Sequence, residues 1–415
     1  MLKNNLKITY SLYDKIITFI IATSIIFSLS SLNKYSASIL LPISLLIFSR
    51  KNNHLKNLNS FYYIILLGLL SSFYSNNFTN YYYFVKDFVF FFQVPIIIVL
   101  GFHVGKRFNL SKKIIKFFVL AYCFAMLKDF IVVIFNLNEF LSDPIIFHNT
   151  NKTNSVNAIL VLIIIFYHKT QKINLYNKFY LNFVILISFS YIIFSFSRTT
   201  ILISFLIILI YNIGYKKKKK LFYLILLTPI IIQFASLIIN LDNFKPDKAE
   251  TRFASKLGNS LNELQIVELD NQFDISHNWR GYEAFLGIEK YFSGDILQLL
   301  IGQGFGANVE VPNWAFSNWD DPSLEGLKNP NIFHIGYITI ILKTGIVGLF
   351  LFVYFLGAFF NKSKLHLFNN FLSQSLIILI VTTTFLTHGL IKPDLNPLIL
   401  ILLGMSFSSV NYNKS

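Results

Sequence analysis

The chain has 415 residues, of which 54% are hydrophobic and only 13% are charged. Because soluble domains usually carry ~25% charged residues, this composition excludes a water-soluble globular protein and places most of the surface against lipid. The net charge of +16 does not indicate nucleic acid binding, because its distribution follows the membrane segments. The single cysteine, Cys123, excludes an intramolecular disulfide and a cysteine-based metal cluster.

Twelve apolar segments predict transmembrane helices, since a helix needs ~20 apolar residues to cross a hydrocarbon core. In chain order they are residues 16–32, 36–49, 60–76, 84–102, 114–137, 155–168, 178–196, 199–215, 220–240, 336–360, 370–388 and 395–411. We therefore predict an all-α polytopic membrane protein. Nine spans form an N-terminal bundle in residues 1–240 and three lie in residues 334–415, with a large, partly helical hydrophilic loop of residues 241–333 between them.

Basic residues are concentrated in alternate connections between the predicted spans, and these connections contain no Asp or Glu. They are Arg50, Lys51, Lys56, Lys106, Arg107, Lys112, Lys113, Lys169, Lys172, Lys178, Lys216 to Lys220, Lys362 and Lys364. By the positive-inside rule, this side and the N-terminus are cytoplasmic. The loop 241–333 holds 14 of the 20 acidic residues and 7 of the 36 basic ones, a net charge of −7, and is expected outside.

Two Lys-Asp pairs lie inside predicted spans, near their outer ends. Lys86 and Asp87 are in the fourth span, and Lys128 and Asp129 are in the fifth. Ionisable residues at membrane depth are costly and are candidates for function. Adjacent helical residues point about 100° apart, so a lysine does not pair easily with its neighbour. Two interpretations stay open: the lysines contact substrate, or each pairs with an Asp of the other helix as packing.

Arg198 lies in a short polar connection, residues 195–200, between two apolar runs. The chain must turn there at the outer membrane face. A guanidinium fork suits the oxygens of a phosphate or pyrophosphate, and the flanking hydroxyls add donors. The alternative is an arginine that extends to the interface without a ligand. Arg252, in the outer loop, is a further cation expected to contact substrate.

Residues 278–292 in the outer loop have helical periodicity with a broad apolar arc that includes Trp279 and Phe292. Arg280 and Glu283 share the other side. Such a helix could lie at the membrane interface and offer Arg280 to an anion, with Glu283 orienting it one turn later. An ordinary ion pair between these two residues on a solvated face is the alternative.

The outer loop ends with a glycine-rich string and a histidine. Glycines in residues 301–306 permit tight turns and close backbone approach, but no βαβ unit supports a dinucleotide site. His334 lies where the loop re-enters the membrane, and a histidine there can accept a proton near neutral pH. Taken alone, such a histidine is more often structural. Its predicted position on the same face as Arg198 and Arg280 favours a shared site.

These features together resemble the bacterial O-antigen ligase and polymerase superfamily of integral membrane glycosyltransferases. The resemblance covers roughly residues 195–350 and depends on the Arg198 turn, Arg280 in an amphipathic segment, the glycines of 301–306, and His334 followed by Gly336-Tyr337 and the stretch 342–348. One departure is Ile335, where the family often has Asn directly after the histidine. The departure concerns a hydrogen bond of that Asn and leaves the histidine in place.

The resemblance implies a helical bundle similar to GT-C glycosyltransferases, in the bacterial inner membrane, with the loop 241–333 periplasmic. It implies transfer of a saccharide from an undecaprenyl pyrophosphate carrier, with neither metal nor cofactor. Arg198 and Arg280 would stabilise the departing pyrophosphate, and His334 would take the proton from the acceptor hydroxyl or orient it. Glu283, Lys86, Lys128 and Arg252 are expected to help bind substrate.

The acceptor decides between a polymerase, which extends lipid-linked repeat units, and a ligase, which transfers the chain to lipid A core. The bias toward Phe, Ile, Asn and Lys, with 46 Phe, is typical of AT-rich polysaccharide gene clusters and favours the polymerase. A polysaccharide flippase remains the alternative from another class. Membrane lipid and the lipid-linked glycan donor and acceptor are the expected partners, and a chain-length regulator is an open one.

Overall fold

The computed structural model describes residues 2–30, 35–48, 55–136, 138, 155–170, 176–194, 198–213, 266–315, 328–361, 369–391 and 397–408. Within these ranges every regular element is a helix, which confirms the predicted all-α class. The α-helices are α1 (Leu2–Ser28), α2 (Ser36–Phe48), α3 (Asn59–Tyr74), α4 (Tyr81–Gly105), α5 (Phe108–Phe135), α8 (Ser155–Thr170), α9 (Lys178–Phe194), α10 (Arg198–Ile213), α13 (Gln272–His277), α14 (Trp279–Phe292), α15 (Ile296–Ile301), α16 (Gly336–Asn361), α17 (Asn369–Leu386) and α18 (Pro397–Met405). The short 3-10 helices are η3 (Lys56–Leu58), η4 (Asn77–Thr79), η7 (Asn313–Ala315) and η10 (Gly389–Ile391).

Three described helices are long and apolar enough to cross a membrane: Tyr81–Gly105, Leu110–Phe135 and Gly336–Phe360. Shorter apolar helices are Ser36–Phe48, Ser155–Tyr167, Lys178–Phe194 and Phe371–Leu386. These findings fit a helical membrane protein, but they do not confirm the predicted twelve spans. The predicted span 220–240 lies outside the described residues.

Helix α4 packs closely against α18 inside the bundle. Gly101 of α4 lies against the backbone of Ile401, and Gly404 of α18 lies against the backbone of Ile98, so a Cβ at either glycine would collide. Small residues of this kind let membrane helices approach closely. α18 ends at Met405, before the end of the predicted span 395–411, and the chain turns there, with the Ser406 and Ser408 hydroxyls bonded to backbone carbonyls.

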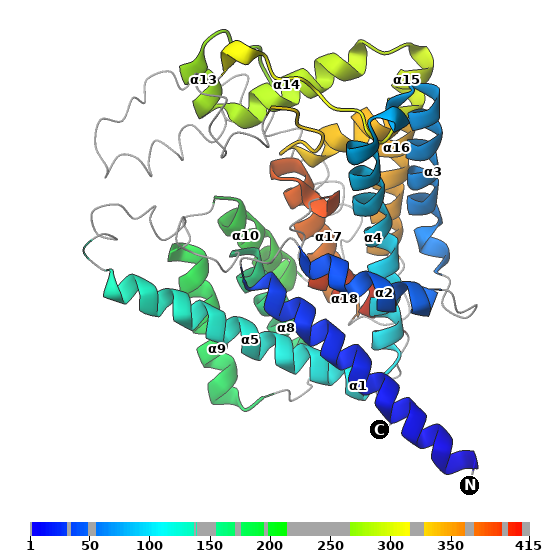
Figure 1. Cartoon of the computed structure of the whole chain (residues 1–415). Coiled ribbons are helices and arrows are strands. Elements are labelled where there is room, and N and C mark those ends of the chain that lie inside the picture. The colour runs from blue at the N-terminus through cyan, green and yellow to red at the C-terminus, as the bar shows by residue number, and fades with distance from the viewer. Residues whose placement is uncertain are drawn as a thin grey trace.

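Helices α13, α14 and α15 lie across one end of the bundle, with α15 beside the end of α3 (Figure 1). The predicted amphipathic segment 278–292 is confirmed as α14. Tyr282 and Leu286 of its apolar arc are buried in a cluster with Phe333 and Ile338, so this part of the arc faces protein rather than lipid. Phe292, at the end of α14, is 67% exposed.

Asp295 ties α15 to α3. Its carboxylate accepts a hydrogen bond from the backbone N–H of Gln298 at 2.8 Å, and the backbone N–H of Asp295 donates to the Gln298 side-chain oxygen. The two bonds form a capping box. The Tyr74 hydroxyl donates to the same carboxylate at 2.8 Å. These bonds, the one from the Gln298 backbone first, lower the pKa of Asp295.

The glycine-rich string is wedged between α3 and α16, where α16 is broken. Gly345 has φ 65°, which interrupts the helix. The carbonyls of Leu342 and Lys343, freed by the break, accept the N–H groups of Gln303 and Gly304 at 2.8 and 3.1 Å. Gly304 has φ 88° and touches the backbone of Ser72, so no side chain fits. The predicted close backbone approach is confirmed.

Candidate active site

His334 lies directly after the loop 241–333 and two residues before the start of α16 at Gly336. Its backbone N–H donates to Glu283 Oε2 at 2.8 Å, and its ring Nδ1 lies 2.8 Å from the same oxygen. The Glu283 side chain is 2% exposed, whereas that of His334 is 32% exposed. One carboxylate oxygen of α14 therefore fixes both the backbone and the ring of the histidine.

This contact selects the tautomer of His334. A carboxylate only accepts hydrogen bonds, so Nδ1 carries its proton toward Glu283, and in a neutral ring Nε2 is then the acceptor. A base held by a buried carboxylate in this way is oriented for proton transfer. The pair can take a proton from a hydroxyl placed at Nε2.

His388 forms a second wall of the site. Its ring centroid lies 4.6 Å from that of His334, with the planes at 46°. The adjacent Thr387 carbonyl accepts the N–H of Gly336, the first residue of α16, at 3.2 Å. The turn after α17 thus meets the start of α16 beside His334. Sequence reasoning missed His388, because it fell at the end of an apolar run with no pattern around it.

Arg280 lies one turn before Glu283 on α14 and is half-buried. The two residues share a face of this helix, and Glu283 uses its carboxylate on His334. Sequence reasoning expected Glu283 to orient Arg280, and the bond to His334 is an addition to that interpretation. A guanidinium and the histidine are thus brought to the same end of α14.

Arg198 is the first residue of α10, and its side chain lies outside the described part of the structure. Leu202, one turn later, packs against the cluster that contains Tyr282 and Phe333. The Thr200 hydroxyl is hydrogen-bonded to that of Ser155, at the start of α8, at 2.7 Å. The start of α10 is therefore adjacent to the cluster under His334. Arg252 lies outside the described residues.

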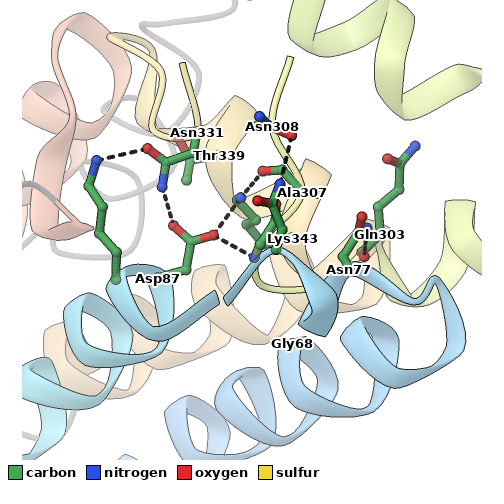
Figure 2. A network of polar contacts seen from close by, with 12 residues as sticks. Gly68, Asn77, Asp87, Gln303, Ala307, Asn308, Asn331, Thr339 and Lys343 are labelled. Atoms are coloured by element: carbon green, nitrogen blue, oxygen red, sulfur yellow. Dashed lines mark hydrogen bonds and ion pairs between the residues drawn. The ribbon is translucent and has the colours of Figure 1, made fainter. Parts of the chain in front are cut away.

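A second, fully buried polar network lies nearby, between α4, α16 and the glycine-rich string (Figure 2). Lys343 Nζ lies 2.5 Å from Asp87 Oδ2, and the two side chains are 0% and 1% exposed. Asp87 also accepts from the Gly306 N–H at 2.9 Å and from Asn331 Nδ2 at 2.7 Å. The Lys343 ammonium also donates to the Ala307 carbonyl. Every oxygen of Asp87 thus has a donor.

The remaining predicted membrane ions have neutral hydrogen-bond partners or are exposed. Lys86 donates to Asn331 Oδ1 at 3.0 Å and is near the Tyr82 and Tyr83 rings. Asp129 accepts from the Tyr191 hydroxyl at 3.0 Å, and Lys128 is exposed. The interpretation that pairs Asp87 with the lysine of the fifth span is wrong, because Lys343 of α16 reaches Asp87 first.

Lys343 and Asn331 were missed as members of a site by sequence reasoning. Lys343 is a charged residue within an apolar span, which is a signal in itself. Among the described residues, no three His, Cys, Asp or Glu side chains gather into a set that could hold a metal ion.

Comparison with known proteins agrees with the geometry. Residues 183–353 match the model of a protein family described as O-Antigen ligase. The matched region includes Arg198, Arg280, Glu283, His334 and Lys343, and it supports the O-antigen polymerase and ligase superfamily. No curated protein and no solved structure matches the chain.

Proposed function

We propose, on the premise that residues 183–353 form an O-antigen ligase-type domain, that this protein is a surface polysaccharide polymerase. It joins oligosaccharide repeat units carried on undecaprenyl pyrophosphate, at the periplasmic face of the inner membrane. The observation that carries the proposal is the His334–Glu283 pair, a partly exposed base held by a buried carboxylate where the outer loop joins α16.

In the proposed reaction, the acceptor hydroxyl oxygen attacks the anomeric carbon of the donor saccharide. The bond from that carbon to the pyrophosphate oxygen breaks, and the carrier pyrophosphate leaves with the bonding electrons. The hydroxyl proton passes to His334 Nε2, and Glu283 stabilises the imidazolium that forms. The site needs no electron donor or acceptor.

Arg280 and Arg198 are proposed to face the pyrophosphate. Negative charge grows on its oxygens as the anomeric bond breaks, so fixed guanidinium groups stabilise the transition state more than the ground state. Arg280 is already on the helix that orients His334. These arginines supply the positive charge that a metal supplies in other glycosyltransferases, so the proposed mechanism is metal-independent.

Lys86, Lys128 and Arg252 are proposed to contact the lipid-linked substrates more loosely. Lys86 is in the second turn of α4, and its partner Asn331 is three residues before His334, so it is the best placed of the three. Lys128 is exposed on α5, and Arg252 belongs to the loop 241–333.

A ligase is the second candidate, because the matched family is described as O-Antigen ligase. Deletion of the gene separates the two, with lipopolysaccharide examined on a gel. A core bearing one repeat unit indicates a polymerase. A bare core together with accumulated long lipid-linked chains indicates a ligase. A bare core without any outward-facing chains would contradict both and favour the flippase.

Complementation of the deletion strain then tests the site. We expect the wild-type gene to restore the ladder of long chains, and Arg280→Ala and Arg198→Ala to fail while the protein still inserts in the membrane. Lys290→Gln, which removes an exposed cation from the same helix as Arg280, is the matched control and is expected to restore the ladder. A normal ladder with Arg280→Ala would remove this residue from the site.

A further inference from the structure

A cavity of about 470 Å³ lies between α1 and α5, near the basic ends of both helices. It is lined by Asp14, Lys15, Thr18, Phe19, Ala22, Leu110 and Lys113. Its volume is in the range of small-molecule sites, which span ≈ 300–1,000 Å³. In Figure 1 these parts of α1 and α5 are at the end of the molecule opposite to α14, so the cavity is separate from the proposed active site.

The mouth of the cavity is positively charged. Its one carboxylate, Asp14, is already paired with the Arg107 guanidinium, which also lies 5.4 Å from the centroid of the Tyr13 ring. The two lysines at the mouth, Lys15 and Lys113, are exposed, and neither has an acidic partner among the described residues. The acid is therefore neutralised, and two cations are available to an incoming anion.

The rest of the lining is mostly apolar, and we call this part the floor. Phe19, Ala22 and Leu110 contribute to it, and Phe19 is 72% exposed, so the floor is open on one side. Ala22 follows Lys15 by seven positions, a rise of about 10 Å along the helix axis. A cationic mouth above an apolar floor matches a molecule with a charged head and a hydrocarbon chain, and a free phosphate would leave the floor unused.

We propose that this cavity binds an anionic phospholipid of the leaflet at the basic face, with its phosphate between Lys15 and Lys113 and an acyl chain along Phe19 and Ala22. Basic pockets between transmembrane helices bind anionic headgroups for this reason. By the positive-inside rule this leaflet is the cytoplasmic one. The site does not depend on the transferase proposal, because it is at the other end of the molecule.

Native mass spectrometry of the purified full chain, titrated with phosphatidylglycerol, tests the proposal. We expect one lipid to remain bound, and Lys15→Gln with Lys113→Gln to weaken binding roughly 30-fold, since each lysine near an anionic headgroup contributes about five-fold. Lys169→Gln with Lys178→Gln is the matched control, because it removes two exposed cations from the same predicted face, outside the cavity. Ala22→Phe, which fills the floor, should weaken binding while the lysines remain.

Three outcomes would overturn the proposal. Equal loss in the cavity and control pairs would show general charge attraction, and unchanged binding in the Ala22→Phe protein would show that no acyl chain enters. Displacement of the lipid by millimolar inorganic phosphate alone would identify a phosphate site instead. Phosphatidylcholine, which has no net charge, is expected to compete weakly. A transferase assay on the same variants separates this site from the proposed function.

Discussion

Two acid–base pairs, Lys343–Asp87 and His334–Glu283, lie near the end of the outer loop, and they differ in their access to water. Lys343 and Asp87 are both fully buried, whereas Glu283 is buried and its partner His334 is about one-third open, at 32%. A charge pair sealed on both sides can only hold elements together, because no substrate reaches it. A pair with one open member can exchange a proton. The comparison assigns stability to the first pair and chemistry to the second.

The largest expected effect is on transfer in His334→Ala. Loss of the base should slow transfer by about 10²–10⁴-fold, while the thermal unfolding midpoint stays at the wild-type value. Transfer of lipid-linked saccharide by purified protein and a melting curve in the same detergent measure the two quantities. His103→Ala is the control for loss of an imidazole, because His103 lies near the C-terminal end of α4, away from Asp87 at the start of that helix. If His334→Ala lowered the melting point as much as Lys343→Met, the two pairs would not differ in role.

Lys343→Met should have the opposite signature. It leaves Asp87 without its cation, and breaking a buried ion pair costs about 3–5 kcal/mol. We expect a lower melting point and less protein in the membrane. Lys328→Met, at an exposed lysine of the outer loop, should change neither. Wild-type stability in Lys343→Met would show that Asp87 is satisfied by Gly306 and Asn331 alone.

Glu283→Gln should lower the rate with little effect on folding. The neutral amide stabilises the imidazolium less than the carboxylate does, by about 1.5–3 kcal/mol, which is a roughly 10- to 150-fold slower transfer. We expect kcat to fall and KM to remain, because Glu283 acts through His334. Glu289→Gln, an exposed glutamate of the same helix, serves as control. A change confined to KM would instead make Glu283 a substrate contact.

Asn331→Ala should have the smallest effect on stability and rate. This residue lies between the two pairs. The side chain is 3% exposed and joins Lys86 to Asp87, so its loss leaves polar atoms unpaired at a cost of about 1–3 kcal/mol. A modest fall in both stability and rate is expected, because His334 is three residues away. Asn329→Ala is the neighbouring control. A slower transfer rate with unchanged stability would instead indicate that Asn331 acts in the reaction with His334 and Glu283.

The sequence predicted the members of the reactive pair but not their contact. His334 and Glu283 were each named from position and periodicity. Helix α14 has a broad apolar arc, so its polar side was expected to offer Arg280 to an anion, with Glu283 orienting it, or to form an ion pair on a solvated face. In the structure, Gly287 on that side lies against Phe333 and Ile338, and this close approach turns Glu283 toward His334. A contact set by a glycine on one helix and a loop on another is a tertiary property.

In the membrane part, too, the sequence predicted individual residues but not their contacts. Asp87 was recognised as costly in an apolar span, yet its partner lies 256 residues later in the chain, beyond the reach of local patterns. The break at Gly345 was also invisible, because an apolar run reads as one continuous span. The turn after Met405 ends α18 before the end of its predicted span, whereas α2 runs through Pro42 from Ser36 to Phe48, over nearly all of the predicted span 36–49.

The break in α16 limits where the outer loop can be exchanged in a chimeric protein. Since the carbonyls of Leu342 and Lys343 are satisfied by Gln303 and Gly304, one hydrogen-bonded unit is shared by the outer loop and a membrane helix. A chimera that exchanges the outer loop for that of another protein, in order to alter sugar preference, would leave those carbonyls unmatched at membrane depth. Grafts should therefore be cut after Gly345 rather than at the membrane boundary.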